Sequence, residues 1–438
     1  MNEKILYYIW LSSTLRAGSK TPKLLLEHYG SIEKIYNAGK EEYKALSVPS
    51  GEISALCNKN LDDAKHHYKY CSDKKIGILC YDDPYYPERL KIIDNPPPMF
   101  YFQGKLCQLD DYPCVTMVGT RSCSERGFRL AYESGFDAAA KGAVIINGLA
   151  LGIDGACISG ALDASGYAVG ILGCGIDRIY PYGNKELFSR LSETGLILSE
   201  FPLFSEPRGT NFPIRNRVMS ALSLATVIFE ASSSSGAMIT AKYALEQGRR
   251  IFAVPAKPYD KNYSGALELI KDGASVFTES DDILTEYSMS FPHRINLANK
   301  AAIPQDKLNS YVAKYFKKDV DPDTPVNRRF LKKRDEKKTK EEKKALFAEE
   351  PANDNEVKKE EKAAVKASVQ ETKSISADLS MLSVTEKTIY EVLVSYGSLT
   401  ADEISEKGVK IDDILSALTL LEIYGLVRAK PGGKYELI

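Results

Sequence analysis

The sequence predicts an α/β protein with an extended Rossmann-like, doubly wound parallel sheet, a small N-terminal helical domain and a C-terminal winged-helix domain. Short apolar runs rich in β-forming residues recur between positions 113 and 278, and helix-length segments separate them. The runs are continuously apolar rather than alternating, which is typical of parallel strands covered on both faces. The chain has 438 residues, too many for one compact core, which indicates two or three domains.

Residues 1–70 carry the first predicted domain, a bundle of short helices. Its helical periodicity is interrupted by the stretches "AGSKTP" and "VPSG". Residues 71–112 follow as a connector rich in proline and aromatic residues, which runs extended where the prolines cluster.

Residues 113–289 form the predicted Rossmann-like domain. Its strand-like runs are "CVTMVGT", "AVIINGLA", "YAVGILG", "LILSEF", "ATVIFEA", "IFAVPA" and "ASVFT". Segments such as "SERGFRLAYESGFDAAAKG" and "GAMITAKYALEQG" supply the helices between them. Because parallel strands joined by helices use right-handed crossovers, the sheet is expected to be doubly wound.

The last two regions differ sharply in composition. Residues 290–377 are charged and lack an apolar stripe, which predicts a disordered or partly helical linker. A solvating tether is the main interpretation, and loose attraction of its basic half to DNA is the alternative. Residues 378–438 are predicted to form a winged helix, with Thr400 as the N-cap of its second helix and a hairpin around "KPGG". The third helix, 410–425, is acidic and apolar, which favours a protein contact or weak DNA binding.

Bulk properties limit the possible partners and compartments. The net charge is −1, so a nucleic acid would have to bind a local basic patch. The N-terminus does not have the pattern of a signal peptide, and no apolar run approaches the ~18 residues of a membrane span. The eight cysteines contain no C-x-x-C pair, which is typical of reduced cysteines in a cytoplasmic protein and predicts no zinc site.

Glycine- and hydroxyl-rich loops follow several predicted strands, at the sheet edge where open parallel sheets bind ligands. Their small residues and the helix starts beyond them predict phosphate binding. The candidates are Gly119, Thr120, Arg121, Ser124 and Arg126 after the first strand, Gly148 after the second, Lys185 after the third, and Ser234, Ser235 and Gly236 after the fifth. Neither G-x-G-x-x-G after the first strand nor a P-loop is present, which argues against a dinucleotide or ATPase site.

Groups for catalysis are sparse in this region. The four histidines, at 28, 66, 67 and 293, all lie outside the predicted sheet domain, which removes the usual general base. Asp154, Asp177, Glu200 and Glu230 lie near strand ends and could bind magnesium or act as bases. The favoured interpretation is that these carboxylates cap helices and pair with nearby arginines. The sequence therefore predicts binding without chemistry, and no cofactor.

A series of motifs resembles the DNA-processing DprA (Smf) family. They are "YPERLKIIDNPPPMFYFQGKL", "VGTRSCSERG", "INGLALGIDGAC", "ILGCGIDRIYPYGN", "LSEFP", "FPIRNRVMSALS", "EASSSSGAMITAKYALEQGR" and "FAVPA", in this order over residues 80–280. The resemblance implies an extended Rossmann fold after a SAM- or helix–hairpin–helix-like domain. It also implies single-stranded DNA binding, usually as a dimer, and loading of the RecA recombinase, with no enzymatic activity.

The same resemblance assigns residues to the DNA site. The phosphate-gripping loop falls on Gly119, Thr120, Arg121 and Ser124, and the F-P-x-R-N-R segment on Phe212, Arg215, Asn216 and Arg217. The chain departs from the family pattern at Leu151, which replaces a cation, and at Cys157, Ser234 and Ala256. Arg126, Lys185 and Arg208 are the cations that could compensate.

Two roles are expected at this site. Arg121, Arg215 and Arg217, with the amides of residues 119–120, would track phosphates, and one of Arg215 and Arg217 could instead brace its segment against a carboxylate. Phe212 would stack on a base, or else pack in the core. The alternative function is a Rossmann-like nucleotide monophosphate phosphoribohydrolase of the lysine-decarboxylase-like group. Its P-G-G-x-G-T-x-x-E motif should follow the fifth strand, where this chain has "EASSSSGAMITAKYALE".

Overall fold

The computed structural model describes residues 2–257, 259–316, 384–405, 414, 417–418, 421, 426–430 and 434–437, in two compact units. The first unit contains the described residues up to 316, and the second contains those from 384 onward. Within these ranges no helix is both long enough and apolar enough to cross a membrane.

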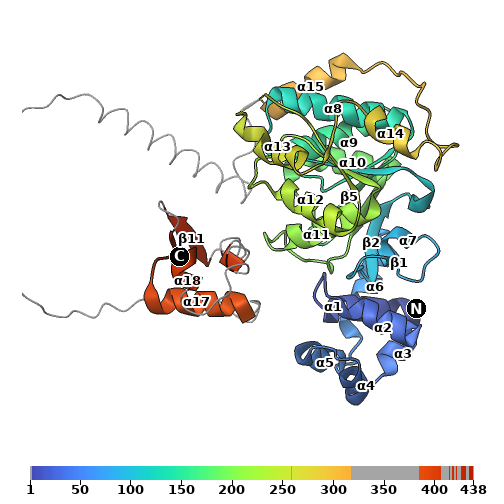
Figure 1. Ribbon diagram of the computed structural model, residues 1–438. Helices are drawn as coiled ribbons and strands as arrows, with labels where there is room; N and C mark the ends of the chain where they lie inside the picture. Colours follow the sequence, from blue (N-terminus) through green and yellow to red (C-terminus); the bar gives the residue numbers. More distant parts are fainter. Residues whose placement is uncertain are drawn as a thin grey trace, which may run out of the picture. The chain divides into compact units, whose positions relative to one another are not determined.

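Six helices begin the first unit: α1 (Glu3–Thr14), α2 (Thr21–Tyr29), α3 (Ile32–Asn37), α4 (Lys40–Ala45), α5 (Ser50–Leu56) and α6 (Asp62–Lys74). They pack around the fully buried Ile9 and Leu11 of α1. Helix α2 ends at Gly30, whose φ of 70° forms a left-handed cap that a side chain would strain. Figure 1 shows α1 to α5 at the opposite end of the unit from α8 and α15.

A nine-stranded sheet forms the centre of the unit, in the order β1-β2-β6-β5-β4-β3-β7-β8-β9. The strands are β1 (Gly77–Cys80), β2 (Met99–Gly104), β3 (Cys114–Val118), β4 (Val144–Asn147), β5 (Ala168–Ile171), β6 (Leu196–Ser199), β7 (Ala225–Ile228), β8 (Arg250–Ala253) and β9 (Ser275–Val276). Strands β3 to β9 are parallel, which confirms the predicted doubly wound sheet. The segment expected as a connector contributes β1 and β2, because its run "MFYFQG" pairs antiparallel with β6.

Helices cover the two faces of the sheet. They are α7 (Glu88–Lys91), α8 (Glu125–Ala140), α9 (Ile153–Asp163), α10 (Lys185–Thr194), α11 (Asn211–Leu222), α12 (Gly236–Glu246), α13 (Ser264–Lys271), α14 (Asp281–Tyr287) and α15 (Gln305–Phe316). Right-handed crossovers place α8 to α10 on one face and α11 to α13 on the other. Helices α8 and α9 pack closely at Gly135, which has no side chain. A Cβ at this position would lie only 2.2 Å from the carbonyl oxygen of Cys157.

Helix α15 corrects the expectation for the start of the linker. Leu308 and Val312, four residues apart on one helix face, are buried against the rest of the unit. The ring of Tyr315 lies 5.0 Å from that of Phe128 on α8. Residues 305–316 therefore belong to the folded unit, whereas positions 317–377 lie outside the described residues.

The second unit contains α17 (Val384–Tyr396), β10 (Leu399–Thr400), α18 (Ala401–Ser405), β11 (Val427–Lys430) and β12 (Lys434–Leu437), with the strands in the order β10-β12-β11. Thr400 caps α18 as predicted: its Oγ1 accepts from the Glu403 amide at 3.3 Å. Glu403 Oε2 accepts from the Thr400 amide at 2.7 Å, which completes a capping box. Most of the predicted third helix and the "PGG" turn lie outside the described residues, so the winged helix stays a prediction.

Candidate nucleic-acid interface

The candidate interface lies at the carboxyl ends of β3, β4 and β5, where the first turns of α11 cross the sheet edge. The F-P-x-R-N-R segment lies within α11, which begins at Asn211. Arg215 and Arg217 are two residues apart on this helix and therefore point to different sides. Both side chains are buried, but their hydrogen-bond partners differ.

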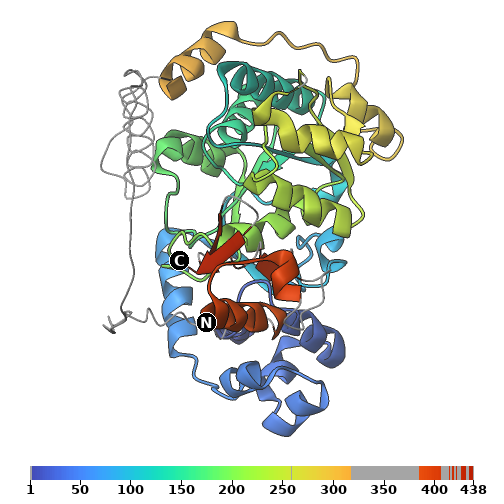
Figure 2. The ribbon, with the colours of Figure 1, turned by 60° about the vertical axis from the view of Figure 1, so that its left-hand side comes forward.

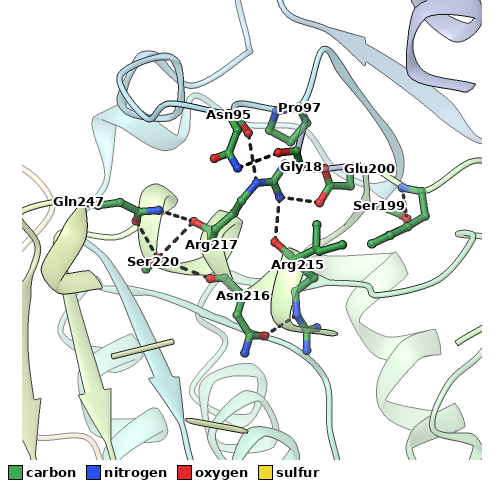
Figure 3. Close-up of polar contacts among 12 residues, drawn as sticks. Gly18, Asn95, Pro97, Ser199, Glu200, Arg215, Asn216, Arg217, Ser220 and Gln247 are labelled. Carbon is green, nitrogen blue, oxygen red and sulfur yellow. Dashed lines mark hydrogen bonds and ion pairs between the residues drawn. The ribbon is translucent and has the colours of Figure 1, made fainter. Parts of the chain in front are cut away.

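Arg217 is a structural residue, which corrects its assignment to DNA. It is 1% exposed, and its Nη1 and Nη2 each donate to a carboxylate oxygen of Glu200 at 2.7 Å (Figure 3). Its Nε donates to the carbonyl oxygen of Asn95 at 3.1 Å, and Nη1 donates to that of Ile214 at 2.9 Å. Every guanidinium nitrogen is engaged, so Arg217 is the arginine that braces the segment against a carboxylate.

Arg215 is also buried, at 4% exposed, which corrects the expectation of a surface phosphate contact. Its Nη1 donates to the carbonyl oxygens of Gly148, at 3.0 Å, and Ile171, and its Nε donates to Asn216 Oδ1 at 3.1 Å. Burial lowers the pKa of Arg215 to about 10, with Asp154 acting in the opposite direction. Its Nη2 has no hydrogen-bond partner in the described part of the chain.

Gly148 leaves the space in which the Arg215 side chain lies. A Cβ on Gly148 would lie 2.2 Å from Nη2 of Arg215, closer than any real contact. Gly148 therefore acts through Arg215 rather than as an anion-binding amide, because its own N–H donates to Asp154 Oδ2 at 3.1 Å. This corrects the predicted role of Gly148.

An arginine and two aromatic rings form the surface of the site. The guanidinium of the exposed Arg121 lies 5.0 Å from the ring centroid of Phe212. The other neighbour of Phe212 is Tyr180, with ring centroids 5.6 Å apart and planes 27° apart. Phe212 is half-buried over Gly173, where a Cβ would lie 2.7 Å from Cδ1 of the ring. The Phe212 ring is therefore partly packed and partly exposed, and its stacking on a base stays a prediction.

The loop after β3 uses its polar groups internally. The Thr120 amide donates to the carbonyl oxygen of Glu230 at 2.7 Å, so it is not free to bind a phosphate as expected. A Cβ on Gly119 would lie 2.6 Å from Ile153, which shows that this glycine is needed for packing. Ser124 caps α8 by accepting from Gly127 at 3.0 Å, and its hydroxyl donates to Glu230 Oε2 at 2.9 Å. These contacts correct the predicted roles of Thr120 and Ser124, and leave Arg121 as the outward-facing group.

The remaining predicted DNA-binding residues lie outside the group formed by Arg121, Tyr180 and Phe212. Arg126 and Lys185, at the starts of α8 and α10, are exposed, and Lys185 Nζ lies 5.6 Å from the ring of Tyr182. Asn216 is buried and donates from Nδ2 to the carbonyl oxygen of Gly236 at 3.3 Å, which corrects its assignment to DNA. Ser235 caps α12, and Gly236 beside it is exposed with open space around it.

The four carboxylates near the strand ends hold the structure together. Glu200 binds Arg217, and Glu230 Oε2 accepts from both the amide and the hydroxyl of Ser124. Asp177 accepts from the Phe204 amide at 2.8 Å. Burial raises the pKa of Asp154, partly offset by Arg215. Of the four, only Glu200 pairs with an arginine as expected; Glu230 accepts from Ser124, and Asp154 and Asp177 accept from backbone amides.

Sequence reasoning missed Tyr180 and Tyr315. Tyr180 stands in the quoted motif "ILGCGIDRIYPYGN", and the signal for it was its position two residues before Tyr182 and near Lys185. Tyr315 donates from its hydroxyl to the carbonyl oxygen of Arg121, and it comes from the segment expected as a linker. Its apolar neighbours four and three residues earlier, Tyr311 and Val312, were the signal for a packed helix.

Comparisons with known proteins agree with this architecture. Residues 77–288 match the family described as DNA recombination-mediator protein A. The chain is 34% identical to protein Smf of Synechocystis over 295 residues, 65% of this chain and 72% of that protein. It is 34% identical to the DNA processing protein DprA of Streptococcus pneumoniae over 227 residues, 52% of this chain and 79% of that protein. The X-ray structure of the Streptococcus protein matches with a TM-score of 0.56 and 28% identity, covering 65% of this chain and 98% of that one. The chain therefore belongs to the DprA/Smf family of DNA recombination-mediator proteins.

Proposed function

We propose that this chain is a non-catalytic protein that binds and protects single-stranded DNA and loads the RecA recombinase during transformation or recombination. The observation that carries the proposal is the exposed guanidinium of Arg121, 5.0 Å from the half-buried ring of Phe212. Single-strand binding needs cations that follow phosphates and aromatic faces that stack on unpaired bases. The Arg121 guanidinium supplies the cation, the Phe212 ring supplies the aromatic face, and the two groups are in contact.

The cations around this pair support an anionic ligand. Arg121, Arg126, Lys185 and Arg208 are exposed, and none of them forms an ion pair with a carboxylate in the described residues. Unpaired cations grouped at one sheet edge attract a phosphate backbone, even in a chain whose net charge is −1. Ser235 and Gly236, at the exposed start of α12, are proposed as further backbone contacts.

Binding to labelled oligo-dT, measured by fluorescence anisotropy over a salt series, tests the proposal. A charge-assisted contact contributes about 1.5–3 kcal/mol, so Arg121→Ala should raise Kd about tenfold or more. It should also reduce the slope of log K against log salt by about 0.7. The matched control is Arg250→Ala, since Arg250 is exposed and lies 5.8 Å from the ring of Phe252 at the opposite sheet edge.

The control should bind like the wild type because Arg250 is neutralised by Glu286 at 2.8 Å. Equal affinity for oligo-dT and duplex, or equal loss of affinity in Arg121→Ala and Arg250→Ala, would refute single-strand binding at this site. A Phe212→Leu variant, which keeps an apolar side chain over Gly173, separates stacking from packing: stacking predicts weaker binding with unchanged thermal stability.

RecA loading and dimerisation are separate parts of the proposal. RecA loading predicts that the full chain shortens the lag of RecA ATPase activity on DNA coated by single-strand-binding protein, and that Arg121→Ala does not. A mass of two chains by light scattering would support the dimer, and a monomer at all concentrations would exclude it. Release of free base from nucleotide monophosphates would contradict the non-catalytic function and revive the phosphoribohydrolase alternative. We place the protein in the cytoplasm, with its proposed partners.

A further inference from the structure

Phe204 lies in a loop beside the candidate interface in an unusual conformation. Its side chain is 42% exposed and its φ is +67°, a left-handed value that bulky residues rarely adopt. Strained positions of this kind persist only where surrounding contacts hold them, and they cluster at functional sites.

Two hydrogen bonds hold the Phe204 backbone in place. The Phe204 amide donates to Asp177 Oδ1 at 2.8 Å. The Nε of the exposed Arg178 donates to the Phe204 carbonyl oxygen at 3.3 Å. Residues 177 and 178 therefore fix the backbone of Phe204 at the surface. The guanidinium of Arg178 lies beside Phe204 for the same reason.

The ring of Phe204 extends toward α6 of the helical domain. It lies 5.0 Å from the ring of Tyr70 and 6.3 Å from that of the exposed His66. Figure 2 shows α6, in light blue, next to the green loop that follows β6. We call Phe204, His66, Tyr70 and Arg178 the Phe204 platform.

The Phe204 platform is continuous with the candidate interface. Arg178 is two residues before Tyr180, which stacks on Phe212, and Phe212 contacts Arg121. Ile179 and Tyr182 on the same segment are 44% and 52% exposed. A row of exposed aromatic and cationic side chains thus runs from Arg121 through the 178–182 segment to α6.

We propose that a single DNA strand bound at Arg121 and Phe212 continues over the 178–182 segment and stacks on the Phe204 platform, so that α6 forms the far end of the binding site. The inference rests on the proposed function and extends it. Alternating cations and exposed rings match the phosphates and bases of a single strand, because stacking accepts any base and cations follow the backbone. The occupant is therefore a longer stretch of the same strand, not a second ligand.

Oligonucleotide length provides the test. The full chain is titrated with oligo-dT of about 6 and about 16 nucleotides, which span the usual range of single-strand site sizes. Phe204→Ala should raise Kd for the longer strand about fivefold to a hundredfold, the effect of losing one stacked base. It should leave Kd for the shorter strand within about twofold, whereas Arg121→Ala should weaken both. Phe204→Trp, which retains a stacking ring, should restore binding of the longer strand.

Two further measurements keep the outcome clear. Tyr85→Ala, which removes another exposed ring, is the control and should bind both strands normally. Photo-crosslinking with iodouracil near one end of the longer strand should label residues 62–74 or 201–208. Equal affinity of Phe204→Ala and wild type for both strands, or crosslinks confined to other segments, would overturn the extension while leaving the Arg121 site intact. Failure of wild type to bind either strand would instead refute the proposed function and this extension together.

Discussion

Arg217 and Glu200 form a buried bidentate ion pair, with both N···O distances at 2.7 Å and both side chains less than 5% exposed. The pair joins α11 to the end of β6. Arg217 also donates to the carbonyl oxygen of Asn95, and Asn95 Nδ2 donates to that of Gly18 at 2.9 Å (Figure 3). One arginine therefore links the sheet edge, the proline-rich segment and, through Asn95, the N-terminal helices.

Removing either partner of this pair should destabilise the protein strongly. Arg217→Ala or Glu200→Gln leaves a buried charge without its counter-charge, which costs about 3–5 kcal/mol. The free energy of unfolding from urea titrations measures the loss. Arg250→Ala, which removes an exposed pair, is the control at about 0–1 kcal/mol. A loss below about 1 kcal/mol in both buried variants would contradict the bracing role.

Gly148→Ala should displace Arg215. The added Cβ would lie 2.2 Å from Nη2 of Arg215, and overpacking of this kind costs about 1–3 kcal/mol. Both the unfolding free energy and the affinity for oligo-dT should fall if Arg215 contributes to the site. Gly51→Ala, on α5 and away from the candidate interface, is the matched control, because no atom lies within 4 Å of its Cβ position. Unchanged DNA binding in a destabilised Gly148→Ala variant would restrict Arg215 to a structural role.

Protonation of His67 should lower the stability of the protein in mild acid. Burial lowers the pKa of His67 below its ordinary value of 6.5, and its Nδ1 lies 3.3 Å from the Tyr101 hydroxyl. The unfolded chain then takes up this proton at a higher pH than the folded chain, so stability decreases as the pH falls below about 6.5. Urea unfolding at about pH 7.5 and about pH 5.5 should show a smaller difference for His67→Gln than for the wild type. An identical pH dependence in the two proteins would exclude His67 as the cause.

Tyr315→Phe should loosen α15 and the Arg121 loop together. The variant removes the hydroxyl that donates to the Arg121 carbonyl oxygen, a hydrogen bond with a net contribution of about 0.5–1.5 kcal/mol. The ring contact with Phe128 at 5.0 Å is retained. Hydrogen–deuterium exchange should become faster in residues 119–124 and 305–316. Faster exchange in the helix alone would show that α15 does not hold the loop.

Much of the candidate site could be identified from short sequence motifs. Arg121 was named because a loop after the first strand is visible as a local pattern, and Phe212 was named by the resemblance to the family motif F-P-x-R-N-R. Arg126, Lys185, Ser235 and Gly236 also lie at exposed helix starts, as their positions after strands indicated. Tyr180 and Phe204 could not be found in this way, since their importance comes from partners distant in sequence.

The amino-acid sequence alone was sufficient to predict the parallel sheet, the order of its helices and the edge at which the candidate site lies. Periodicity and loop composition are local properties, and crossover handedness converts them into topology. Which side chains at that edge face outward became clear from the folded chain. The sequence does not distinguish Arg121, Arg215 and Arg217. In the folded chain Arg217 is buried in an ion pair with Glu200, and Arg215 donates to backbone carbonyl oxygens. Burial and long-range partners depend on the packed chain, and they leave Arg121 as the arginine exposed above Phe212.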